Sequence, residues 1–117
     1  MRRNSKYNAM PTVASDGTKF PSKAEAKFYE SLLALQRTGQ IKEIVLHPRF
    51  PMPPKLEIGQ QKICDYVSDF RVTWKGEGPY QRKDEIFEVK GYETEAWKLK
   101  KKMFAFWYPH LILTVVK

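Results

Sequence analysis

Two segments of the sequence, residues 65–74 and 86–90, alternate between apolar and charged side chains. Successive residues of a β-strand face opposite sides of the sheet, so each segment is predicted to be a strand with one apolar face. Asp69 belongs to the first segment, and Glu88 and Lys90 belong to the second. If the two strands pair, these three charged side chains converge on the polar face of the sheet. Residues 61–74 are therefore predicted to form one long central strand, with residues 84–90 as a second strand paired to it.

Two carboxylates and an ammonium group in this arrangement suit phosphodiester hydrolysis. That reaction uses hard oxygen ligands to hold a divalent metal ion, which neutralises the phosphate and lowers the pKa of the attacking water. Asp69 and Glu88 supply such oxygens, and the chain has no cluster of His and Cys to favour zinc. Lys90 is predicted to orient the water and stabilise the negative charge that develops on the phosphorus. The alternative is ordinary surface charge, with Glu88 paired to Lys90 or to Arg71 across the strands.

A hairpin and a helix are predicted to precede these strands. Asp16-Gly17 favours a tight turn within residues 12–20. Ser22 is a suitable N-cap for a helix that ends at Thr38-Gly39, with Glu25 at the third helical position. Residues 41–46 are predicted to form a short strand, and the proline-rich residues 50–54 a loop or an edge strand.

A second helix is predicted over residues 92–108, and residues 111–116 form a last strand. Four residues at helical spacing make its predicted core stripe, Ala96, Leu99, Met103 and Phe106. Its other aromatic residues are predicted to pack in the core, with a dimer seam as the alternative; these are Trp97, Phe104, Trp107 and Tyr108. His47 and His110 have no partner at metal-ligand spacing and are predicted to be structural.

The order of these motifs resembles that of the PD-(D/E)xK nuclease superfamily. The segment Asp16-Gly17-x-x-Phe20-x-Ser22-Lys23-x-Glu25-Ala26 precedes the first helix, Asp69-Phe70 and Glu88-Val89-Lys90-Gly91 follow, and Thr94 leads into a lysine-rich helix. Within the superfamily, the chain is similar to small phage and prophage proteins related to archaeal-type Holliday junction resolvases. The resemblance covers residues 15–117.

The resemblance implies an α/β fold, with a small mixed sheet flanked by helices in a restriction-endonuclease-like core. It also implies a Mg²⁺-dependent endodeoxyribonuclease in which Mn²⁺ can replace Mg²⁺ and the products carry 5′-phosphate and 3′-hydroxyl ends. The implied catalytic residues are Glu25, Asp69, Glu88 and Lys90. The implied metal ligands are Asp69, Glu88, Glu25 and the main-chain carbonyl of Val89. A capping box with Ser22 is an alternative explanation of Glu25 that needs no catalysis.

The charge balance predicts a polyanionic partner. The chain has 117 residues, a length typical of one domain, and its 21 Lys and Arg against 13 Asp and Glu give a net charge of +8. Residues 1–11 are predicted to be a mobile basic arm in which Arg2 and Arg3 contact phosphates, or else a frayed terminus. Lys98, Lys101 and Lys102 are predicted to bind DNA, with a solvated helix face as the alternative.

Compartment and membrane association follow from simpler features. The single cysteine, Cys64, excludes an internal disulfide and fits a reducing compartment. No apolar core follows the basic N-terminal residues, and the apolar run 111–116 is too short to span a bilayer. The sequence therefore predicts a cytoplasmic protein with no membrane association, in the bacterial host cytoplasm if the protein is phage-encoded.

The sequence thus predicts a single nuclease domain over residues 1–117 that cuts branched DNA such as a four-way junction, as a homodimer. Two alternatives remain open. One keeps the chemistry and changes the substrate to flaps, nicks or single strands. The other is a non-catalytic basic module that binds nucleic acid through the N-terminal arm and the lysine cluster.

Overall fold

The computed structural model describes residues 10–76 and 84–117, so Arg2, Arg3 and most of the predicted basic arm lie outside the described residues. The N-terminal half comprises the short strands β1 (Thr12–Val13) and β2 (Lys19–Phe20), helix α1 (Lys23–Arg37), and strands β3 (Ile41–Leu46) and β4 (Arg49–Met52). The C-terminal half comprises β5 (Cys64–Val67), β6 (Phe70–Trp74), β7 (Glu85–Val89), helix α2 (Glu95–Trp107) and β8 (Ile112–Val116).

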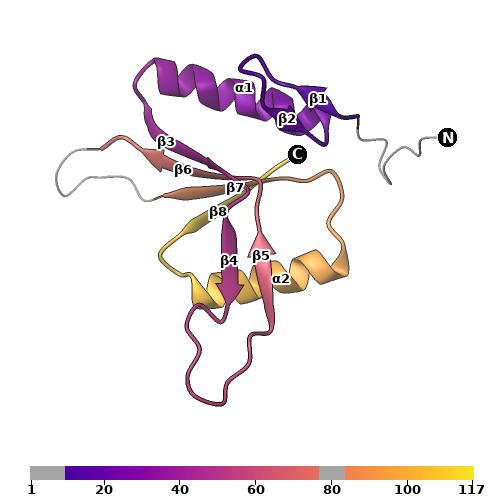
Figure 1. Cartoon of the computed structure of the whole chain (residues 1–117), viewed down its shortest axis with the longest axis vertical. Helices are drawn as coiled ribbons and strands as arrows, with labels where there is room; N and C mark the ends of the chain where they lie inside the picture. Colours follow the sequence, from indigo (N-terminus) through magenta and orange to yellow (C-terminus); the bar gives the residue numbers. More distant parts are fainter. Residues whose placement is uncertain (1–9, 77–83) are drawn as a thin grey trace.

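The central sheet has four strands in the order β3-β6-β7-β8. β3, β6 and β7 are antiparallel neighbours, whereas β8 runs parallel to β7. A parallel pair needs a crossover connection, and α2 provides it between β7 and β8. In Figure 1, α1 lies on one side of this sheet and α2 on the other, with the β4–β5 ribbon on the α2 side. The prediction of a small mixed sheet with one helix from each half of the chain is confirmed.

The predicted N-terminal hairpin and first helix are confirmed, and the residues predicted to turn and cap them do so. The amide of Thr18 donates to Asp16 Oδ1 over 3.0 Å, and Gly17 adopts a φ of 91°, which closes the predicted hairpin turn. Ser22 Oγ accepts from the Glu25 amide over 3.1 Å at the start of α1. Gly39, with a φ of 84°, follows the end of the helix. These elements hold Glu25 in the first turn of α1.

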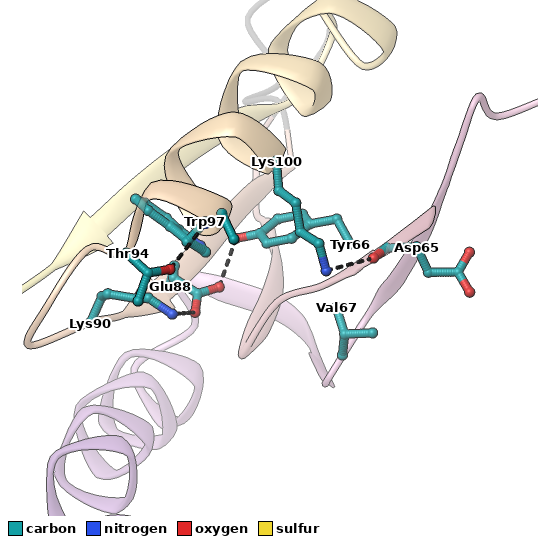
Figure 2. Close-up of a pocket in the computed structure, with 9 residues that line it drawn as sticks. Asp65, Tyr66, Val67, Glu88, Lys90, Thr94, Trp97 and Lys100 are labelled. Carbon is teal, nitrogen blue, oxygen red and sulfur yellow. Dashed lines mark hydrogen bonds and ion pairs between the residues drawn. The ribbon is translucent and has the colours of Figure 1, made fainter. Parts of the chain in front are cut away.

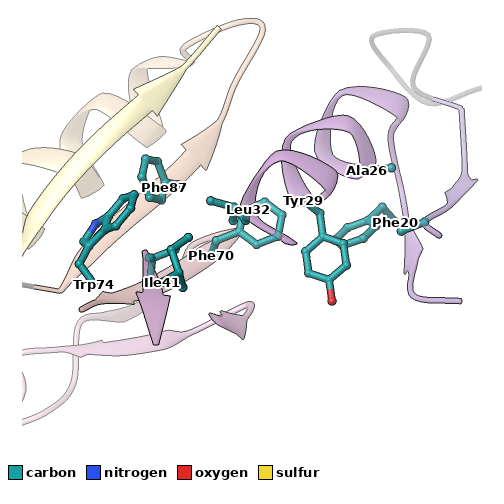
Figure 3. Close-up of a cluster of buried hydrophobic side chains, with 10 residues drawn as sticks. Phe20, Ala26, Tyr29, Leu32, Ile41, Phe70, Trp74 and Phe87 are labelled. Atoms are coloured by element: carbon teal, nitrogen blue, oxygen red, sulfur yellow. The ribbon is translucent and has the colours of Figure 1, made fainter. Parts of the chain in front are cut away.

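One face of the sheet packs against α1 and the β1–β2 hairpin. Figure 3 shows the aromatic side chains of β6 and β7 meeting those of α1 and β2. The rings of Tyr29 and Phe70 are stacked with centroids 6.0 Å apart, and Phe20 lies 5.8 Å from Phe70. The buried members of this first core are Ala14, Phe20, Ala26, Tyr29, Leu32, Ile41, Phe70, Val72, Trp74 and Phe87.

The opposite face packs against α2 and the β4–β5 ribbon. Ile86 and Phe87 are adjacent in β7 but belong to different cores, as strand alternation requires. The buried members of this second core are Phe50, Met52, Tyr66, Ile86, Trp97 and Phe104. Glu88 has the same parity as Ile86, so its carboxylate enters the side of the sheet that α2 covers.

The prediction of one continuous strand over residues 61–74 is wrong. The chain leaves the strand at Ser68 and Asp69, so β5 pairs with β4, and β6 pairs with β3 and β7. Ser68 Oγ donates to the carbonyl of Phe87 over 2.7 Å, and Asp69 Oδ2 accepts from the amide of Val89 over 2.7 Å. These side-chain bonds to β7 replace ladder bonds at the break. As a result, Tyr66 and Phe70 lie in different cores.

The predicted core stripe of α2 is also wrong, except at Met103, which packs against the second core. Leu99 and Phe106 are 59% and 76% exposed, whereas Trp97 and Phe104 are 6% and 1% exposed. Both sets have helical spacing, so the period alone could not choose between them, and the face with the larger aromatic rings is buried. The predicted packing of the aromatic residues in the core is confirmed for Trp97 and Phe104. α2 starts at Glu95, later than predicted, because Thr94 caps it by accepting from the Trp97 amide over 3.1 Å.

Within residues 10–76 and 84–117, neither helix has the length and apolar character needed to cross a membrane.

Candidate functional site

Glu88 lies at the end of β7 in a buried position, with 7% of its surface exposed. Tyr66 Oη donates to Glu88 Oε1 over 2.6 Å, and Lys90 Nζ lies 3.7 Å from Glu88 Oε2 (Figure 2). Burial raises the pKa of Glu88, whereas the bond from Tyr66 and the charge of Lys90 lower it. Lys90 Nζ also lies 5.3 Å from the centroid of the Trp97 ring. The polar end of β7 is therefore organised by groups from β5 and α2.

Asp69 is held beside this strand end by the break between β5 and β6. Its Oδ2 accepts from the Val89 amide over 2.7 Å, which fixes the carboxylate against the residue between Glu88 and Lys90. Burial raises the pKa of Asp69, while the Val89 amide and the charges of His47 and Lys90 lower it. His47 was predicted to be structural only. The structure places it next to Asp69, because its amide donates to the Asp69 carbonyl over 2.9 Å.

Glu25, in the first turn of α1, lies near enough to Asp69 and Glu88 for their charges to act on it. Burial, and after it the negative charges of Asp69 and Glu88, raise the pKa of Glu25 to about 7. Among the described residues, Glu25 Oε2 is buried without a hydrogen-bond partner. The Ser22 cap forms as predicted through the Glu25 amide, but capping does not account for this carboxylate oxygen. An unpaired buried oxygen near two other carboxylates is the kind of group a cation would stabilise.

The four predicted catalytic residues are thus brought together from three parts of the chain: the first turn of α1, the break before β6, and the end of β7. Negative charge on Asp69 and Glu88 raises the pKa of Glu25, so a bound cation would relieve that repulsion. Among residues 10–76 and 84–117, no three side chains of His, Cys, Asp or Glu converge closely enough to hold an ion alone. A Mg²⁺ site uses one or two carboxylates and completes its shell with water and substrate phosphate. The Asp69 and Glu88 pair, with the Val89 carbonyl, fits that description.

A pocket opens beside Glu88, on the side of α2 (Figure 2). It has a volume of about 310 Å³. Its walls combine charged, hydroxyl and apolar groups, from Asp65, Tyr66, Val67, Glu88, Lys90, Thr94, Ala96, Trp97 and Lys100. Sequence reasoning missed Tyr66, Trp97 and Lys100 as site residues. The spacing of Trp97, Lys100 and Phe104 on one helix face is the signal that could have found Lys100.

A family model matches residues 4–117, and its description is a protein of unknown function, DUF1064. The chain belongs to the DUF1064 family. Comparison with curated proteins gave no match, and comparison with solved structures gave none either. The DUF1064 match contains Glu25, Asp69, Glu88 and Lys90, but its description assigns them no chemistry.

The three lysines predicted to bind DNA differ in their surroundings in this DUF1064 chain. Lys98 Nζ lies 3.3 Å from Glu95 Oε1, an exposed ion pair worth little stability. Lys101 Nζ lies 5.6 Å from the centroid of the Trp97 ring, and Lys102 is exposed. All three lie on α2, the helix that forms one wall of the pocket.

Proposed function

We propose that the protein is a metal-dependent endonuclease that hydrolyses phosphodiester bonds in DNA. The observation that carries the proposal is that Asp69, Glu88 and Lys90 lie together at the end of β7 and that their charges act on Glu25 of α1. Without an ion, the charges of buried Glu88 and of half-buried Asp69 and Glu25, whose pKa values are all raised, would destabilise the fold. If these positions served only to stabilise the fold, apolar side chains would be favoured at them.

In this proposal, Asp69, Glu88 and the main-chain carbonyl of Val89 hold Mg²⁺, for which Mn²⁺ can substitute. When bound, the ion would neutralise charge on the scissile phosphate and lower the pKa of the attacking water. The Val89 amide and Tyr66 Oη fix the two carboxylates through their bonds of 2.7 and 2.6 Å. Lys90 is 26% exposed at its side chain, so it can reach a substrate phosphate and stabilise the charge that develops there.

Glu25 acts in this proposal as a further ligand or as the base that accepts a proton from the attacking water. A pKa of about 7 suits a group that exchanges protons near neutral pH. Water attacks phosphorus in line with the leaving 3′ oxygen, which leaves 5′-phosphate and 3′-hydroxyl ends.

The finer parts of the proposal are a restriction-endonuclease-like core and branched DNA, such as a four-way junction, as substrate. The arrangement of an antiparallel β6–β7 pair, a helix on each face and a basic α2 supports them. A junction has two symmetric strands to cut, so the proposed enzyme is a homodimer. Lys98, Lys101 and Lys102 would contact phosphates next to the cleavage site.

The test is cleavage of labelled four-way junction, fork and linear duplex by the purified protein, with Mg²⁺ or with EDTA. Asp69→Asn is the informative variant, because asparagine keeps an oxygen that can accept from the Val89 amide and removes only the charge. We expect it to lower cleavage by about a hundredfold or more. Glu43→Gln, at an exposed position on β3, is the matched control and should cleave like wild type.

Symmetric nicks in the junction that disappear with EDTA and in Asp69→Asn would support the full proposal. Cleavage of the fork or duplex alone would keep the chemistry and change the substrate. Binding without cleavage, unchanged in Asp69→Asn, would refute the nuclease proposal in favour of a non-catalytic nucleic-acid-binding module.

A further inference from the structure

The pocket beside Glu88 is lined in part by residues that have no role in the proposed cleavage reaction. Glu88 and Lys90 line it, but Asp69 and Glu25 do not. The pocket therefore extends from the candidate cleavage site toward α2 and β5. In the nuclease proposal, a group bound in this pocket would therefore lie next to the scissile phosphate, on the side of α2 and β5.

The pocket offers an anion site at one end. Lys100 is half-buried, and its Nζ lies 3.5 Å from the main-chain carbonyl of Asp65, so it is held in the pocket wall (Figure 2). Lys100 has no carboxylate partner within residues 10–76 and 84–117. A phosphate at this end would meet an unneutralised ammonium group.

The aromatic and apolar residues of the lining suit the faces of a flat ring. Tyr66 and Trp97 are 2% and 6% exposed and form the floor. Val67 and Ala96, both exposed, stand on opposite walls that belong to β5 and α2. A volume of about 310 Å³ is at the lower end of small-ligand pockets, which is suitable for one nucleotide and too small for a base pair.

We propose that this pocket binds one unpaired nucleotide of the cleaved DNA strand, adjacent to the scissile phosphate. Its base lies between Val67 and Ala96, and its phosphate pairs with Lys100. The inference rests on the proposed nuclease function and adds a substrate requirement to it. A base must leave the duplex stack to enter, and this costs least where DNA is already unpaired, at a branch, flap or gap. The pocket thereby selects branched or frayed DNA over continuous duplex.

The test measures binding in EDTA, where cleavage is not needed, by fluorescence anisotropy with labelled forked DNA whose branch fixes the register. One abasic residue is moved through successive positions around the branch. Wild type should lose affinity about tenfold at a single position, which is the contribution expected of one packed base. Ala96→Trp and Val67→Trp fill the pocket from its two walls and should abolish that position effect. Two variants keep the test valid if one of them fails to fold.

Lys100→Gln tests the phosphate end of the pocket. It should keep the position effect, weaken binding to all forks, and reduce the slope of log affinity against log salt by about one. Lys42→Gln, an exposed lysine on β3, removes the same charge away from the pocket and should leave the affinity and the salt slope as in wild type.

Equal binding at every abasic position, or a position effect that survives both tryptophan variants, would overturn the pocket assignment. These outcomes are separate from those of the nuclease proposal. A position effect without cleavage in Mg²⁺ would refute the nuclease and leave the nucleotide site standing. Cleavage without a position effect would support the nuclease and refute the nucleotide site.

Discussion

At the scale of single residues, Glu25 is the most informative group in the structure. Its carboxyl has a pKa raised from 4.5 to about 7, chiefly by burial and then by Asp69 and Glu88. A raised pKa means that the folded protein holds this proton more tightly than the unfolded chain does. The resulting stability is present below pH 4.5 and is lost as the pH rises through 7. At higher pH the metal-free protein carries an unfavourable buried charge.

We therefore expect Glu25→Gln to stabilise the metal-free protein at pH 8. The gain should be on the order of 1 kcal/mol, because solvent screens a half-exposed side chain, and it should vanish at pH 4. Urea unfolding at several pH values in EDTA measures it. Added Mg²⁺ should stabilise wild type more than Glu25→Gln if Glu25 is a ligand. A variant that is less stable than wild type at both pH values would show that Glu25 serves the fold alone.

Tyr66 is the second residue whose role can be separated from general packing. Its hydroxyl group donates to buried Glu88 and lowers the pKa of that carboxyl. Tyr66→Phe should lower the free energy of unfolding by about 1–3 kcal/mol, because a buried carboxylate oxygen loses its donor. It should also raise the Mg²⁺ concentration for half-maximal cleavage about tenfold, since outer ligands of a metal site typically have that effect.

Tyr108→Phe is the matched control for that change. Tyr108 Oη donates to the Pro51 carbonyl over 2.6 Å and not to a carboxylate. Its loss should reduce stability by about 1 kcal/mol and leave the Mg²⁺ dependence as in wild type. If cleavage by the two variants depended on Mg²⁺ in the same way, Tyr66 would have no role in the metal site.

At the scale of elements, the orientation of α2 decides which residues form the site. The buried face carries Trp97 and Phe104, and Lys100 between them therefore enters the pocket. Phe104→Ala should destabilise the protein by about 3–5 kcal/mol, as for other fully buried aromatic residues. Phe106→Ala, at a 76% exposed position of the same helix, should change stability by less than about 0.5 kcal/mol in the monomer. Urea unfolding at low protein concentration compares them, and equal losses would mean that α2 is rotated from the described orientation.

The elements that could be predicted from the sequence are those with strong local signals. Ser22 and Gly39 bound α1, and Asp16-Gly17 turns the first hairpin, because capping and positive φ are properties of a few adjacent residues. The break at Ser68 could not be predicted, since it depends on bonds from Ser68 and Asp69 to β7, which is remote in sequence. Apolar and charged residues alternate in both β5 and β6, so the sequence pattern gave no sign that the two strands pair with different partners.

The candidate site shows the same division. Asp69, Glu88 and Lys90 could be placed together because strand parity and one pairing are enough to bring them to one end of a sheet. The Tyr66 and Lys100 contacts required the β4–β5 ribbon to fold back under α2, which no local pattern indicated. Glu25 could be placed near the site only through the family resemblance.

At the scale of the whole molecule, both faces of the described sheet are covered, by α1 on one side and by α2 on the other. β8 pairs with β7 alone in the described sheet. Leu99 and Phe106, 59% and 76% exposed, share the outer face of α2, which precedes β8. Exposed apolar side chains that share one helix face are a feature of association surfaces. This region is therefore the surface we assign to the proposed homodimer.

Phe106→Glu should convert the dimer into a folded monomer, because a charge in the centre of an apolar interface cannot be desolvated without a partner. Sedimentation equilibrium measures the mass, and thermal unfolding verifies the fold. Ile58→Glu, at a fully exposed position on the loop between β4 and β5, is the matched control and should remain dimeric.

The monomeric variant should still nick one strand of a junction but lose the paired, symmetric cut. In the proposed dimer each protomer carries its own site, and only the twofold assembly places two sites on the two symmetric strands. A wild-type protein that is monomeric at every concentration, yet still makes paired cuts, would contradict the dimer. Dissociation by Ile58→Glu alone would place the interface on the β4–β5 ribbon.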